Sequence, residues 1–156
     1  MQNLNEFELK PAYEFDGISI VFTVSGALGD SIISKKVFET IIDVEKNCKI
    51  DLFCKNKSSI LYAKNFYIDS KNFNCIIDEH FFNENINYYD LALNVTQAIH
   101  ILFINFERIR QLSPKLFEIL VKINIYNQKY IYSKDFCGKI LFNMARARIL
   151  DLNCFT

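Results

Sequence analysis

The sequence has few glycines and prolines, and its charges cancel. Its 156 residues include four glycines and two prolines. No segment is rich in proline, glycine or serine, so nothing in the composition marks a flexible linker between two domains. Eighteen basic and eighteen acidic residues give a net charge of zero. Because this balance creates no overall field toward nucleic acid, it argues against nucleic-acid binding.

The sequence also lacks a metal-binding or disulfide pattern. Its five cysteines are odd in number and widely spaced, and no CxxC motif or Cys/His cluster occurs. Such cysteines are typical of buried thiols in a reducing compartment, and we predict no metal site. The two histidines, His80 and His100, have no cysteine or serine partner at a spacing typical of catalysis. We interpret both as surface or core residues. The cysteines are Cys48, Cys54, Cys75, Cys137 and Cys154.

Long apolar runs of the kind that enter membranes are missing too. Residues 1–17 have no basic region followed by an apolar core, so they do not resemble a secretory signal. The most apolar long window, residues 91–109, is interrupted by polar side chains such as Asn94, Gln97 and Arg108, which excludes a transmembrane segment. The sequence therefore predicts a cytoplasmic protein, and peripheral contact with a membrane surface stays open.

Apolar and aromatic residues are abundant instead. Hydrophobic residues make up 51% of the chain, which contains 15 phenylalanines and 8 tyrosines. This content argues against disorder and indicates a globular protein. A chain of this length fits one ordinary domain, which buries about 70% of the surface that the unfolded chain exposes.

Strand-like and helix-like segments alternate along the chain. Short runs of β-branched and aromatic residues predict buried strands, and apolar residues at helical spacing predict helices. Ser113 and Pro114 are typical of a helix start. Residues 96–112 fit either a helix or a strand followed by a helix, and Asp16-Gly17 fits a hairpin turn. The predicted strands are 18–24, 48–54, 75–78, 89–95 and 129–132, and the predicted helices are 28–44, 57–67, one from Ser113-Pro114, and 136–152.

This order of elements predicts the fold class. Buried strands that alternate with helices indicate a parallel sheet covered on both faces. We predict an α/β protein with a single Rossmann-like three-layer α/β/α sandwich and a mainly parallel sheet. Residues 1–17 would form an N-terminal arm, and residues 18–156 the domain.

The loop after the first strand holds two of the four glycines. It reads SGALGD, from Ser25 to Asp30. Gly26 and Gly29 are three residues apart and no Gly-Lys-Ser/Thr follows, so the loop is neither a dinucleotide fingerprint nor a P-loop. In doubly wound sheets this loop borders the ligand crevice, where glycines let the backbone turn sharply and approach a ligand.

Asp30 at the end of this loop has two interpretations. A carboxylate in the first turn of a helix is favourable against the helix dipole by ~0.3 to 1 kcal/mol, which stabilises the helix start. A carboxylate at the mouth of the sheet is also able to accept a proton from a substrate hydroxyl as a general base. The residues alone leave both interpretations open.

The segment SIVFTVSGALGDSIISKKVFETI, followed by CKIDLFC, FNCIID and YYDLALNV, resembles the amino-terminal domain of bacterial heptosyltransferases, glycosyltransferase family nine. The shared pattern is a strand, a small-residue loop, Gly29-Asp30, two apolar residues and Ser34. The resemblance implies one half of a GT-B fold. The closing NMARARILDLN is similar to the helix that leads toward the second domain in this family. It follows that the donor-binding domain is expected outside this chain.

The resemblance also implies an activity. Such enzymes transfer a sugar, often heptose from ADP-heptose, to lipopolysaccharide or a related surface glycan with inversion, and they need no metal or other cofactor. Asp30 would be the general base. A carboxyl-terminal domain or a partner subunit would complete the active site of this bacterial protein, and peripheral contact with the inner membrane stays open. The acceptor-side residues would be Gly26, Gly29, Ser34, Asn94 and Gln97.

Two other functions fit the same residues. One is a non-catalytic Rossmann-like module that binds a nucleotide, a sugar phosphate or a protein partner at the crevice. The other is a small complete enzyme of flavodoxin-like architecture.

Overall fold

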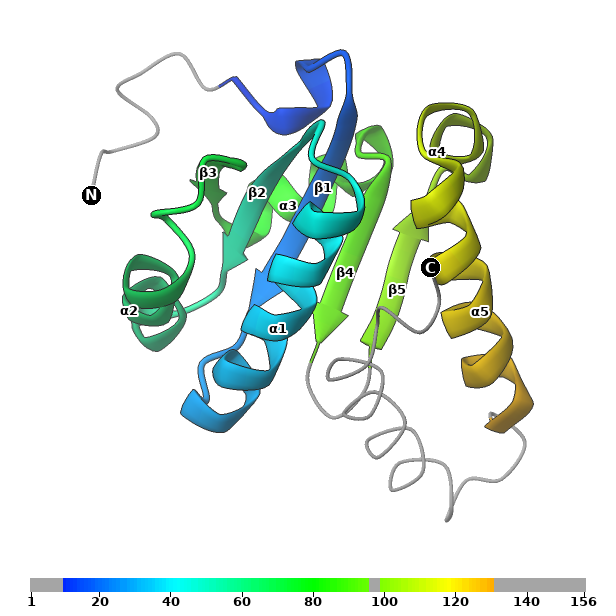
Figure 1. Ribbon diagram of the computed structural model, residues 1–156. Helices are drawn as coiled ribbons and strands as arrows, with labels where there is room; N and C mark the ends of the chain where they lie inside the picture. Colours follow the sequence, from blue (N-terminus) through cyan, green and yellow to red (C-terminus); the bar gives the residue numbers. More distant parts are fainter. Residues whose placement is uncertain (1–9, 96–98, 131–156) are drawn as a thin grey trace.

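The protein is built around one five-stranded sheet, in the order β3-β2-β1-β4-β5 (Figure 1). The computed structural model describes residues 10–95 and 99–130, and residues 123–130 by their backbone alone. The first four strands are parallel, and β5 is antiparallel to β4. The strands are β1 (Ile18–Val24), β2 (Cys48–Cys54), β3 (Phe73–Ile77), β4 (Leu91–Val95) and β5 (Ile99–Ile104).

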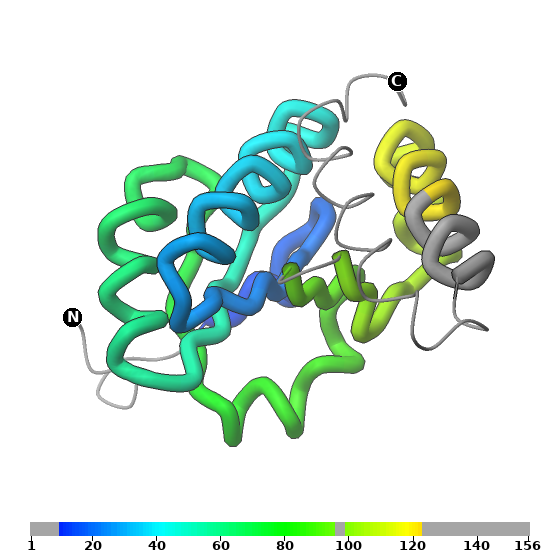
Figure 2. The backbone as a smooth tube through the Cα atoms, turned by 90° about the horizontal axis from the view of Figure 1, so that it is seen from below, coloured from blue at the N-terminus to red at the C-terminus, as the bar shows by residue number. Residues whose placement is uncertain are grey.

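Helices cover both faces of this sheet. Viewed along the strands, α1, α2 and α5 form a layer on one face, and α3 lies on the other (Figure 2). The α4 helix connects β5 to α5. This arrangement confirms the predicted Rossmann-like α/β/α domain. The helices are α1 (Leu28–Val44), α2 (Lys57–Phe66), α3 (Glu79–Asn85), α4 (Phe106–Leu112) and α5 (Pro114–Tyr130), with 3₁₀ helices η1 (Ala12–Glu14) and η2 (Ile86–Tyr88).

The central strand β1 contributes to two hydrophobic clusters. Ile20 and Phe22 belong to the larger cluster, which α1, α2 and α5 cover, whereas Val21 belongs to the smaller cluster on the α3 face. Successive side chains of a strand point to opposite faces. A strand buried on both faces is therefore rich in β-branched and aromatic residues on both sides, which is the pattern that predicted β1, although Ser19 and Thr23 interrupt its apolar run.

Most predicted elements are confirmed. The strands 18–24 and 48–54 and the helix 28–44 have the predicted bounds. β3 begins earlier than predicted because Phe73 already pairs with Ile50, and β4 begins later, at Leu91. Residues 96–112, for which the sequence allowed two predictions, form a strand followed by a helix in their described part.

The strand predicted at 129–132 is wrong in its described part, because α5 continues to Tyr130. A short apolar run fits a buried helix as well as a strand. The predicted helix 136–152 lies outside the described residues. In the part of the chain that the structure describes, no helix has the length and apolar character needed to cross a membrane.

The segment predicted as an arm packs against the sheet in its described part. Ala12 is fully buried, and its N–H donates to the Asp51 carboxylate of β2 at 2.8 Å. A 3₁₀ helix and bends precede β1, so residues 10–17 form no hairpin at Asp16-Gly17. The glycine has a different role: a Cβ at Gly17 would lie 2.5 Å from the backbone oxygen of Asn47. Glycine permits this close approach.

We predict opposite effects for alanine at two of the glycines. Gly17→Ala should lower the free energy of unfolding by about 1 to 3 kcal/mol, because the new methyl group overlaps the Asn47 backbone oxygen. Gly29→Ala is the matched control. A Cβ at Gly29 would meet nothing within 4 Å, and alanine favours helix by up to about 1 kcal/mol. Urea denaturation of both variants measures the difference, and a destabilised Gly29→Ala would contradict it.

Candidate functional site

The predicted site lies at the edge where the parallel strands end, which faces the viewer in Figure 2. β1 ends at Val24 and leads through residues 25–27 into α1, while its neighbour β4 ends at Val95. Along the chain, β2 and β3 are added on one side of β1, and β4 and β5 are then added on the other side, so the strand order reverses between β1 and β4. Ligands of doubly wound sheets bind at such a reversal of strand order.

Asp30 lies on the stripe of α1 that, farther along the helix, faces β4. Residues three and seven positions after it, Ile33 and Val37, follow the same stripe of the helix. Val37 and Ile41 line an apolar pocket together with Leu93 of β4 and Leu116 of α5. The stripe that contains Asp30 is therefore directed toward the junction of β1 and β4.

The Asp30 carboxylate is half-buried, and it forms no hydrogen bond or ion pair with any residue that the structure describes. It belongs to the first turn of α1, where the Ala27 N-cap provides no side-chain hydrogen bond. Leu28 and Ile32, on either side of it in the sequence, are 51% and 53% exposed. The carboxylate thus remains available to a ligand beside an apolar rim.

Gly26 and Gly29 provide close packing and open space, and neither adopts an unusual backbone conformation. No described glycine has a positive φ, so neither glycine is required here for a left-handed backbone. A Cβ at Gly26 would lie 3.1 Å from the side chain of Asn56, the N-cap of α2. Gly26 therefore lets the loop contact the start of α2. Gly29 has open space on its exposed side, next to Asp30.

Ser34 does not lie at the surface of the site. It is fully buried, and its hydroxyl hydrogen-bonds the Tyr67 hydroxyl at 2.7 Å and the Ser31 carbonyl at 3.2 Å. The acceptor contact predicted for Ser34 is corrected accordingly: its hydroxyl is used between α1 and the end of α2. Burial raises the pKa of Tyr67 to about 12, and the hydrogen bond from Ser34 lowers it in part.

Ser31 orders the loop instead. Its hydroxyl donates to the carbonyl of Ser25 at 3.1 Å, and its own carbonyl accepts from the Tyr67 hydroxyl at 3.0 Å. The first turn of α1 is thereby tied both to the loop and to α2. In the sequence, the signal for this loop contact is a small hydroxyl residue directly after Asp30.

Asn94 is half-buried near the end of β4, beside its register partner Thr23 of β1. Its amide forms no hydrogen bond with any described residue. Gln97, the other residue predicted after β4, lies outside the described residues. The structure therefore brings Asn94 and the loop that leads to Asp30 to one edge of the sheet.

A buried carboxylate on β2 belongs to the core and not to this site. Asp51 is fully buried, and its Oδ2 accepts from the Ala12 N–H at 2.8 Å and the Tyr89 hydroxyl at 2.6 Å. Its Oδ1 accepts from the Asn74 amide at 2.8 Å and the Cys75 thiol at 3.2 Å. In the sequence, the charged residue within the apolar run CKIDLFC indicates a buried carboxylate that needs hydrogen-bond partners.

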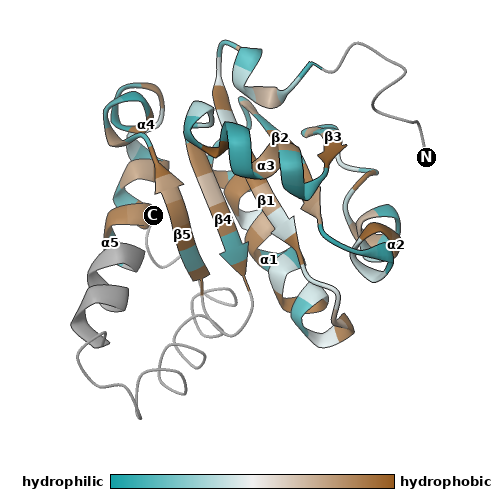
Figure 3. Cartoon of the chain, turned by 180° about the vertical axis from the view of Figure 1, so that it is seen from behind, coloured by the Kyte–Doolittle hydropathy of each residue, from teal (hydrophilic) through white to brown (hydrophobic). Residues whose placement is uncertain are grey.

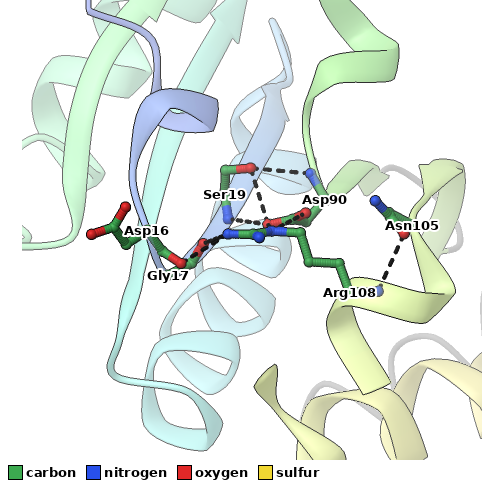
Figure 4. A network of polar contacts seen from close by, with 6 residues as sticks. All are labelled: Asp16, Gly17, Ser19, Asp90, Asn105 and Arg108. Carbon is green, nitrogen blue, oxygen red and sulfur yellow. Dashed lines mark hydrogen bonds and ion pairs between the residues drawn. The ribbon is translucent and has the colours of Figure 1, made fainter. Parts of the chain in front are cut away.

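A second polar network lies at the opposite edge of the sheet, where β1 and β4 begin (Figure 4). The Asp90 carboxylate is buried, accepts from the Ser19 N–H at 2.9 Å, and pairs with the Arg108 guanidinium at 3.0 Å. Arg108 also donates to the carbonyls of Asp16 and Gly17 at 2.8 and 3.1 Å. Because the buried Asp90 carboxylate is paired with Arg108, we interpret this network as structural: it fixes α4 to the sheet.

The described cysteines are thiols inside the domain. Cys48 and Cys54 are buried, and burial raises the pKa of each to about 12. A neutral thiol is a poor nucleophile and a poor metal ligand. Cys137 and Cys154 lie outside the described residues.

The histidines and acidic residues form no metal centre within residues 10–95 and 99–130, where no three His, Cys, Asp or Glu side chains come together as ligands. His80 lies on α3 and pairs with Glu84 at 3.4 Å. His100 is exposed on β5, directly opposite Asn94.

Comparison with family models, with curated proteins and with solved structures finds no match to this chain.

Proposed function

We propose that the edge formed by the ends of β1 and β4 binds the acceptor sugar of an inverting, heptosyltransferase-like glycosyltransferase. Asp30 is the general base, and the nucleotide sugar binds to a second domain or subunit. The observation that carries the proposal is the Asp30 carboxylate itself. It is unpaired among the described residues, and it lies in the first turn of α1, directly after β1, the strand beside which strand order reverses.

The chemistry needs one carboxylate close to one hydroxyl. Asp30 takes the proton of the acceptor hydroxyl as its oxygen forms a bond to the anomeric carbon of the donor. The bond between that carbon and the nucleoside diphosphate breaks on the opposite face, so the configuration inverts. The hydroxyl has to lie about 2.6 to 3.2 Å from the carboxylate. The open space at Gly29 provides room for this approach.

The charges of the loop before α1 favour a neutral ligand. The loop from Ser25 to Asp30 contains no lysine or arginine. Lys55, just after β2, pairs with Glu79 at 3.3 Å. Phosphate groups are usually bound by lysine, arginine or a glycine-rich loop at a helix start. The candidate loop does lead into a helix start, but the Asp30 carboxylate there repels a phosphate, so a hydroxyl-rich acceptor suits this loop better than a nucleotide or a sugar phosphate, the ligands of the alternative module.

A thermal-shift screen tests this proposal. The probes are heptose-containing oligosaccharides, their phosphorylated forms and ADP. A ligand that binds only the folded state adds about 2.7 kcal/mol to the free energy of unfolding at a hundredfold excess over Kd, and it thereby raises the melting temperature. We expect a saturable rise with the neutral oligosaccharides, and its loss in Gly29→Leu, which fills the open space. A rise with ADP or sugar phosphate alone would support the binding module instead.

A further inference from the structure

Four side chains form a row across the sheet, just before its carboxyl edge. Phe53, Thr23, Asn94 and His100 are successive register partners on β2, β1, β4 and β5. Register partners of neighbouring strands point to the same side of a sheet. Phe53 belongs to the hydrophobic cluster beneath α3. The whole row therefore lies on the α3 face.

The α3 layer covers only one end of this row. Phe53 stacks on Phe82 of α3, with ring centroids 4.2 Å apart and an interplanar angle of 12°. Farther along, Asn94 is half-buried and His100 is exposed. Figure 3, which views this face, shows hydrophilic colour at the end of β4 and near the start of the neighbouring strand β5. Among the described elements, α3 thus leaves the polar part of the row uncovered.

The polar side chains of the row have unused hydrogen-bonding capacity. The Thr23 hydroxyl is buried and has no hydrogen-bond partner within the described part of the chain. Native proteins satisfy nearly all such groups, and an unsatisfied buried group costs about 1 to 3 kcal/mol. The side chains of Asn94 and His100 also form no hydrogen bond with residues that the structure describes. One hydroxyl, one amide and one imidazole therefore lie side by side without a hydrogen-bond partner among the residues that the structure describes.

We propose that Asn94 and His100, next to the buried hydroxyl of Thr23, bind uncharged ring hydroxyls of the acceptor sugar. The reacting hydroxyl of that sugar extends over the carboxyl edge of the sheet to Asp30. This inference rests on the proposed function, because it assigns the substrate class of the same site. Amide and neutral imidazole groups each provide a donor and an acceptor, which match sugar hydroxyls. The row contains no lysine or arginine, so it has none of the cations that bind phosphate through charge-assisted hydrogen bonds.

The two histidines make this inference testable by NMR, because His80 is an internal control. It lies on α3, outside the row, and its side chain is 81% exposed. In a titration with a neutral heptose-containing oligosaccharide, we expect the imidazole resonances of His100 to shift saturably and those of His80 to stay in place. His100→Ala and Asn94→Ala should each raise Kd about five- to tenfold, the equivalent of one hydrogen bond. His80→Ala should leave Kd unchanged, and His100→Gln should restore part of the affinity.

The outcomes separate this inference from the proposed function. Saturable binding that shifts the Asp30 backbone resonance but not His100 would overturn the row and leave the glycosyltransferase proposal intact. A shift of His100 with the neutral sugar, together with full transfer activity in Asp30→Asn, would support the row and overturn the role of Asp30. A shift of His100 with the phosphorylated form alone would overturn the assignment to uncharged hydroxyls.

Discussion

Asp30→Asn should lower the rate of sugar transfer by about 100- to 10,000-fold and leave the protein folded, because that factor is typical of a general base. An asparagine side chain has almost the same shape as aspartate but does not accept the proton of the acceptor hydroxyl. The carboxylate has no partner among the described residues, so its loss breaks no contact of the domain. The folded state should lose only the interaction with the helix dipole, ~0.3 to 1 kcal/mol.

Initial rates of sugar transfer from the nucleotide sugar to the acceptor measure the effect. Asp43→Asn is the matched control, since Asp43 is exposed near the other end of the same helix. The control should keep normal turnover. If Asp30→Asn kept near-normal turnover as well, Asp30 would have no part in the reaction, and its role would be to stabilise the start of α1.

The largest loss of stability is expected from Asp51→Ala, at about 3 to 5 kcal/mol. The Asp51 carboxylate accepts hydrogen bonds from four groups, among them the Ala12 N–H and the Tyr89 hydroxyl. Alanine leaves these donors inside the protein without an acceptor, at about 1 to 3 kcal/mol for each that stays dry. Since a domain is stable by only about 5 to 15 kcal/mol, much of the chain should be unfolded at low urea.

Urea denaturation followed by circular dichroism measures this loss. Asp69→Ala is the matched control, because Asp69 is exposed in the turn after α2. The control should stay within about 0.5 kcal/mol of the original protein, as surface substitutions usually do. An equal loss in both variants would show that the buried carboxylate has no special part in stability.

The same cluster predicts a loss of stability at alkaline pH. Burial raises the pKa of Tyr89 and of Cys75, and the charge of Asp51 raises both further. The folded state therefore keeps protons that the unfolded chain releases near the ordinary pKa values of 9.0 for the thiol and 10.0 for the phenol. Stability is complete below these values and falls as the pH rises above them. In Asp51→Asn, which removes the charge, the fall should be smaller.

The elements that the sequence determined are those with a strong local pattern. Residues 18–24 form an apolar run that only Ser19 and Thr23 interrupt, because both faces of β1 are buried, and the apolar positions of α1 repeat at the helical period. The pattern failed at Lys129 and Tyr130, where a few apolar residues at the end of α5 resemble a strand. Periodicity shows which side of an element is buried, and it is ambiguous only where a run is short.

The sequence by itself thus determined the class of the fold and the loop that carries Asp30, because both depend on residues that are neighbours along the chain. Only the tertiary structure decided which residues meet. Tyr89 reaches Asp51 from 38 positions away, and Asp90 reaches Ser19 from 71. Only strand order and register place Asn94 between Thr23 and His100. Ser34, which follows the family pattern in the sequence, is turned into the core by the helical period, and Ser31 bonds to the loop. These outcomes depend on contacts between distant segments, which local periodicity does not specify.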